Sequence, residues 1–170
     1  MTDADKDISL LKQYCARLKY EIVKEHKDAK AWHLHFKLGE TILSAERQPN
    51  CDFCYIFFSL NIQDTKIHEI LDKVDRDPQF IYGLKSAIFD PNVGVSFILD
   101  KEHFRGYHIS KRLFLHGAPF SIKDFDDAVQ AVAMVGALGL AFVNSVIGDN
   151  QTVQKIGQEI PKTSPDGMYY

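Results

Sequence analysis

The spacing of apolar residues changes along the chain between a helical and a strand period, and these changes mark out its elements. Over residues 8–22 apolar residues recur every three or four positions, which predicts an opening amphipathic helix that ends near Leu18–Tyr20. Apolar and polar residues alternate strictly over Ala31–Leu38, which predicts a half-buried strand. The stretch Cys51–Leu60 is apolar at both alternating sets of positions, as in a strand covered on both faces.

A second helix is predicted from Asp64 onward. Asp64 has the side chain of an N-cap, one apolar stripe runs over residues 67–74, and Pro78 prevents the helix from continuing. Short turns join the remaining predicted strands, so we expect an antiparallel sheet. Those strands are Glu21–Glu25, Thr41–Glu46, Phe80–Phe89, Val95–Leu99 and Tyr107–Leu115, with a hairpin turn at Asp90–Gly94.

The longest predicted element is a helix over Ile122–Ile147. Ser121 and Asp124 have the spacing of an N-cap pair, and no charged residue occurs from Ala128 to Gly148. Such a helix is buried on more than one side. Its length would also suffice to cross a membrane, but Ala and Gly predominate and acidic residues flank the uncharged run. A core helix is therefore the favoured interpretation.

Together these elements predict an α+β fold. We expect an antiparallel sheet of about five to seven strands with three helices on one face, in the order α-β-β-β(β)-α-β-β-β-α. Residues 1–150 are expected to form a single domain. Residues 151–170 are polar and contain two prolines, which predicts a loosely held C-terminal tail.

Four stretches together resemble a known fold family. They are the opening helix running into Glu21–Glu25, the aromatic strand Trp32–Leu38, the helix Asp64–Arg76 and the closing run Arg112–Ser121. Their order over residues 7–148 resembles the type III secretion chaperone-like fold, and above all a family of uncharacterised, largely archaeal proteins with that fold. That family has no established activity. The resemblance implies a non-catalytic, dimeric module that binds protein partners.

Composition narrows the classes of partner and compartment. The chain has 20 Lys and Arg against 23 Asp and Glu, a net charge of -3, which argues against nucleic acid as the main partner. One basic stretch, Lys101–Arg112, is interpreted as the solvated face of a hairpin. Three cysteines, together with a polar start that lacks a signal-peptide pattern, predict a cytoplasmic protein with free thiols.

Two pairs of residues could carry chemistry. Cys51 and Cys54 form a C-x-x-C pair, but redox chemistry needs the first Cys at a helix N-terminus, and zinc needs further ligands. His33 and His35 lie on one face of a predicted strand, about 7 Å apart. We expect no cofactor, no bound transition metal and no Cys51–Cys54 disulfide. The alternative is a ligand- or metal-dependent enzyme or sensor that uses His33, His35, Cys51 and Cys54.

The favoured hypothesis is a non-catalytic protein-binding or chaperone-like module that self-associates as a homodimer. The long helix carries more apolar surface than one sheet face of this size can cover. Small residues at every fourth position would let another backbone approach closely. The predicted dimer contact therefore includes Ala133, Ala137 and Ala141.

A second contact is predicted for a protein partner. The strand Thr41–Glu46 alternates weakly and is followed by Pro49, which are marks of an edge strand. An edge strand can pair with an extended segment of another protein. We therefore expect partner binding at Thr41, Ile42 and Leu43.

Overall fold

The computed structural model describes residues 3–28, 30–116 and 120–148. Within these ranges the helices are α1 (Asp3–Leu18), α2 (Thr65–Val74), α3 (Pro78–Ala87) and α4 (Ile122–Ile147). The strands are β1 (Glu21–Lys27), β2 (Trp32–Leu38), β3 (Thr41–Arg47), β4 (Phe53–Asn61), β5 (Gly94–Asp100) and β6 (His103–Phe114). The strands form one antiparallel sheet in the order β1-β2-β3-β4-β6-β5. The predicted α+β class is confirmed, and the predicted tail 151–170 lies outside the described residues.

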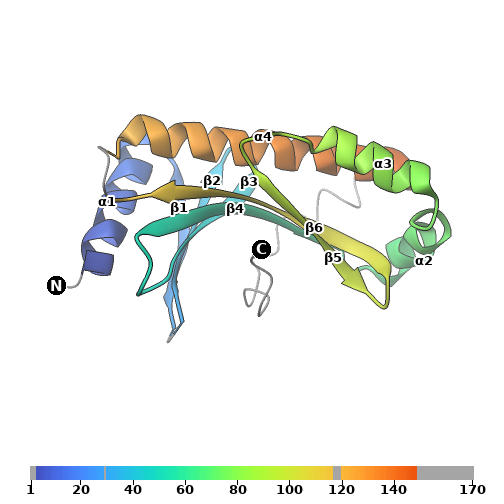
Figure 1. Cartoon of the computed structure of the whole chain (residues 1–170), viewed down its shortest axis with the longest axis horizontal. Helices are drawn as coiled ribbons and strands as arrows, with labels where there is room; N and C mark the ends of the chain where they lie inside the picture. Colours follow the sequence, from blue (N-terminus) through green and yellow to red (C-terminus); the bar gives the residue numbers. More distant parts are fainter. Residues whose placement is uncertain (1–2, 29, 117–119, 149–170) are drawn as a thin grey trace.

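Helix α4 runs along one face of the sheet, with α1 near its beginning and α3 beside its second half (Figure 1). Its predicted start is confirmed: the Ser121 hydroxyl accepts a hydrogen bond from the Asp124 N–H, and the Asp124 carboxylate accepts one from the Ser121 N–H. The helix ends at Gly148, whose left-handed backbone suits glycine. Both boundaries are thus fixed by local sequence.

Small residues let α4 lie close to the sheet. A side-chain carbon at Gly136 would come within 2.7 Å of the Phe58 ring, and one at Gly139 would come within 2.6 Å of Ile88 and of Tyr107. The Tyr107 hydroxyl also donates a 2.8 Å hydrogen bond to the Gly136 carbonyl oxygen. These two glycines therefore serve the contact between α4 and its own chain rather than a contact with a partner.

The prediction of a strand at Phe80–Phe89 was wrong, because this segment belongs to α3. Asp77 caps the helix by accepting a hydrogen bond from the Gln79 N–H, and Pro78 occupies the first turn, where its missing N–H costs nothing. Pro78 therefore ends one helix and begins the next. As a result, the segment Asp90–Gly94 joins α3 to β5 instead of forming a hairpin turn between two strands.

The prediction of an edge strand at Thr41–Glu46 was also wrong. The strand is β3, which lies between β2 and β4 in the sheet. Its pairing with β2 runs over all of Thr41–Arg47, and its pairing with β4 covers Ser44–Arg47. The two edges of the sheet are β1, which is exposed along its whole length, and β5. Weak alternation arose because both faces of β3 are largely covered, not because the strand lies at an edge.

The register divides the sheet residues between two faces. The paired residues Leu34, Ala45 and Ile56 are fully buried on the face that α4 covers. Their neighbours His33, Glu46, Tyr55 and Arg112 pair across four strands and point to the opposite face, which we call the far face. This division decides which of the candidate site residues can meet.

Candidate functional site

The four residues of the predicted metal alternative do not converge. His33 and His35 belong to the far face of the sheet. Cys54 pairs with Arg47 and Leu113 on the face that α4 covers, and it is fully buried there. The Cys51 thiol lies 3.6 Å from the side-chain oxygen of Gln48, in the turn before β4. The two histidines and Cys54 therefore lie on opposite faces of the sheet, so one metal ion could not bind all of them.

The buried thiols are poor nucleophiles at neutral pH. Burial raises the pKa of Cys54 to about 12, although the nearby Arg47 works in the opposite direction. Burial also raises the pKa of Cys15 to about 12. Because the thiolate is the reactive and metal-binding form, both residues act as small apolar side chains.

The histidines form a row on β1 and β2. The rings of His26 and His33 are stacked 5.9 Å apart, and those of His33 and His35 are stacked 6.5 Å apart. The His35 Nδ1 lies 2.7 Å from the Ser44 hydroxyl. Burial, with a smaller contribution from the charge of His33, lowers the pKa of His35 from 6.5 to about 4. His35 is therefore a neutral, hydrogen-bonded interior residue at physiological pH.

The residues predicted to bind partners have different environments. Leu43 is fully buried, while Thr41 and Ile42 are half-buried, so the interior position of β3 removes the reason for placing an extended partner there. On α4, Ala133 is buried against the core. Ala137 and Ala141, by contrast, are exposed on the outer side of the helix.

The outer side of α4 carries an uncharged stripe, which we define as Met134, Ala137, Leu138 and Ala141. Met134 is 56% exposed and Leu138 is 51% exposed, values that are high for large apolar side chains. The four positions follow helical spacing, so they form one continuous strip. The stripe presents two small and two large apolar residues to the surroundings.

Helix α3 packs beside this part of α4. The Phe80 and Phe142 rings lie 5.8 Å apart, and Ile88 contacts α4 at Gly139. Tyr82 on α3 and Phe89 just after it are the most exposed large apolar residues among those described. Exposed apolar side chains thus occur on both helices at this end of α4.

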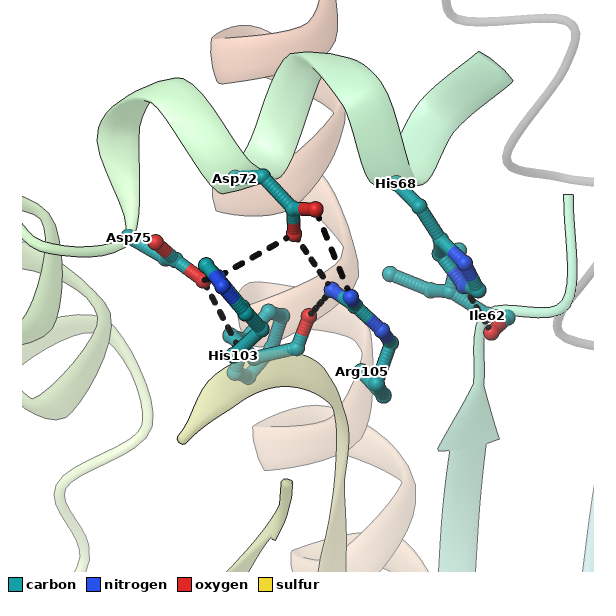
Figure 2. A network of polar contacts seen from close by, with 7 residues as sticks. Ile62, His68, Asp72, Asp75, His103 and Arg105 are labelled. Carbon is teal, nitrogen blue, oxygen red and sulfur yellow. Dashed lines mark hydrogen bonds and ion pairs between the residues drawn. The ribbon is translucent and has the colours of Figure 1, made fainter. Parts of the chain in front are cut away.

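Sequence reasoning missed a polar cluster between α2 and the beginning of β6, which we define as Asp72, Asp75, His103 and Arg105 (Figure 2). The His103 Nδ1 lies 3.3 Å from Asp72 Oδ1 and 3.1 Å from Asp75 Oδ2. Arg105 donates a 2.7 Å hydrogen bond to Asp72, which holds the pKa of that carboxyl below its ordinary value. Asp75 is the C-cap of α2 and follows Asp72 by three positions, so the two carboxylates lie on the same side of the helix end, which is the only local signal of the cluster.

The basic stretch Lys101–Arg112 is split between two places. His103 and Arg105 join the polar cluster below α2. Arg112 lies on the far face, where its guanidinium stands 4.6 Å from the centre of the Phe53 ring and donates a hydrogen bond to the Tyr55 hydroxyl. The stretch therefore forms no single cationic surface.

Among the described helices, α4 is long and apolar enough to cross a membrane by length and composition. One third of the residues in its most apolar window, 33%, are buried inside the fold. A core helix of a soluble protein can pass the same test, so this property is weak evidence for a membrane span.

No protein-family model matches the chain, and no curated protein matches it in sequence. Two solved structures are similar in fold. An uncharacterised protein from Methanothermobacter thermautotrophicus superimposes with a TM-score of 0.68 at 12% sequence identity, covering 82% of this chain and 98% of its own. YbjN from E. coli gives a TM-score of 0.45 at 10% identity, covering 79% of this chain and 89% of its own. The first likeness shows a shared fold with an archaeal protein.

Proposed function

We propose that this chain is a non-catalytic, self-associating protein-binding module, and that two copies meet through the stripe on α4. The observation that carries the proposal is the exposure of Met134 and Leu138 beside Ala137 and Ala141 on a helix that has no charged residue after Asp127. Contiguous exposed apolar surface of this kind marks interaction sites in soluble proteins.

A second copy fits this stripe better than an unrelated partner. In a two-fold dimer the same patch faces itself, so each large residue needs a small one opposite. Alternation of Met134 and Leu138 with Ala137 and Ala141 supplies that match. The absence of charge along the stripe also means that two copies meet without repulsion between like charges. We propose that this association takes place in the cytoplasm.

The test is a pair of charge substitutions at leucines of similar exposure. Leu138→Glu places a carboxylate on the stripe, whereas Leu99→Glu places one on β5, where Leu99 is 58% exposed. Sedimentation velocity is expected to show a dimer for the wild-type chain and for Leu99→Glu, and a monomer for Leu138→Glu. A dimer that survives Leu138→Glu, or one that only Leu99→Glu disrupts, would place the interface elsewhere.

A further inference from the structure

The cluster between α2 and β6 has the donor types and the spacing of a metal site. We propose that Asp72, Asp75 and His103 bind one divalent transition-metal ion, with zinc as the best fit. The two distances from His103 Nδ1 to the carboxylate oxygens, 3.3 and 3.1 Å, are close to the ~3.4 Å that separates two ligands of a tetrahedral zinc ion with bonds of about 2.1 Å. The three donor atoms all lie within 4.8 Å of one another.

An unsatisfied buried oxygen supports this assignment independently of the spacing. The Asp75 side chain is only 2% exposed, and its Oδ1 atom has no hydrogen-bond partner among the described residues. A buried carboxylate oxygen without a partner is costly, because it has lost its water and gained nothing in exchange. A cation bound to the same carboxylate would neutralise the buried charge and offset this cost.

The surroundings hold the donors in place. Asp75 Oδ2 accepts a 2.9 Å hydrogen bond from the Phe104 N–H, and Asp72 Oδ1 accepts one from Arg105. Such outer contacts orient carboxylates in metal sites. Arg105 also donates a hydrogen bond to the Phe104 carbonyl oxygen, which fixes the guanidinium beside Asp72. The carboxylates of Asp72 and Asp75 carry two negative charges, and the Arg105 guanidinium carries one positive charge. The remaining negative charge would attract a divalent cation.

The site is also accessible from solvent. The Asp72 side chain is 36% exposed and that of His103 is 22% exposed, so an ion can enter from the surface and keep a water molecule as its fourth ligand. The ion would link the end of α2 to the beginning of β6.

The proposed site uses none of the residues from which the sequence predicted no bound metal. Those residues were Cys51, Cys54, His33 and His35. The proposed site is also independent of the self-association proposed at α4.

The experiment is calorimetric titration of zinc into the full chain after removal of metals with a chelator. The wild-type protein is expected to bind one equivalent with saturation. His103→Gln and Asp72→Asn change partly exposed residues and should fold, as circular dichroism will show, yet weaken zinc binding by more than about tenfold. His33→Gln and Cys51→Ser are the matched controls, since they remove a histidine and a thiol outside the cluster, and they should bind zinc as the wild type does.

Three results would overturn the proposal. The first is the absence of saturable binding of one equivalent in the wild type, which would mean that His103 simply forms ion pairs with the two carboxylates. The second is undiminished binding in folded His103→Gln and Asp72→Asn proteins. The third is loss of binding in His33→Gln or Cys51→Ser, which would move the ion to the other histidines or to the thiol.

Discussion

At the scale of single residues, Gly106 has the least freedom to change. Its φ of +152° is a conformation that residues with side chains rarely adopt, and an added carbon would lie 2.0 Å from the Leu60 carbonyl oxygen on the neighbouring strand. Gly106→Ala is therefore expected to cost more than about 3 kcal/mol or to prevent folding. Gly39→Ala is the control, because Gly39 also has a positive φ but has open space around it, and should cost about 1 kcal/mol. Urea denaturation measures both, and equal costs would show that β4 and β6 do not approach so closely.

His35 makes a second prediction at this scale. Because burial lowers its folded-state pKa from 6.5 to about 4, the unfolded chain binds more protons between these pH values, and stability should fall as the pH falls through 6.5. Replacing His35 with Gln removes this contribution. The loss of unfolding free energy between pH 7.5 and 5.5 should then be about 1 kcal/mol smaller than in the wild type.

An exposed apolar residue of β1 supplies the control for this measurement. Val23→Ala should retain the wild-type dependence on pH, because it removes no ionisable group. His108, whose pKa burial also lowers, leaves a residual dependence in all three proteins. An unchanged dependence in His35→Gln would mean that folding does not lower the pKa of His35.

At the scale of elements, the position of β3 in the sheet can be tested with two truncations. Leu43 on β3 is fully buried, whereas Val23 on β1 is 39% exposed at a sheet edge. Leu43→Ala should lower the free energy of unfolding by about 2–5 kcal/mol, and Val23→Ala by less than about 1 kcal/mol. Urea denaturation of both variants measures the difference. If Leu43→Ala proved as mild as Val23→Ala, the result would contradict the burial of Leu43 on a strand inside the sheet.

The elements that sequence predicted correctly are those with a strong local signal. Helix α4 has its cap pair at Ser121 and Asp124, and β2 has strict alternation, so neither depends on distant residues. The neighbours of β3 could not be predicted, because strand order depends on contacts between segments far apart in the chain. The same holds for the polar cluster, in which His103 lies 28 residues from Asp75. Helix α3 was missed because a proline serves equally well to stop and to start a helix.

At the scale of the whole molecule, α4 has two roles on its two sides. Its inner side packs on β4 and β6 through small and β-branched residues, while its outer side carries the stripe of Met134, Ala137, Leu138 and Ala141. Helix α2 lies at one end of the sheet (Figure 1), and the cluster of Asp72, Asp75 and His103 lies below this helix (Figure 2). A change in zinc binding should therefore leave self-association intact, and Leu138→Glu should leave zinc binding intact.

The mass of the wild-type chain in solution tests the central claim most directly. Light scattering during size-exclusion chromatography, over a range of loading concentrations in the tens of micromolar, is expected to give twice the 19.4 kDa of one chain. Dyes that bind exposed apolar surface should then bind little, because the stripe on α4 is covered in the dimer. A mass of one chain across that range, with no dye binding, would contradict self-association through α4.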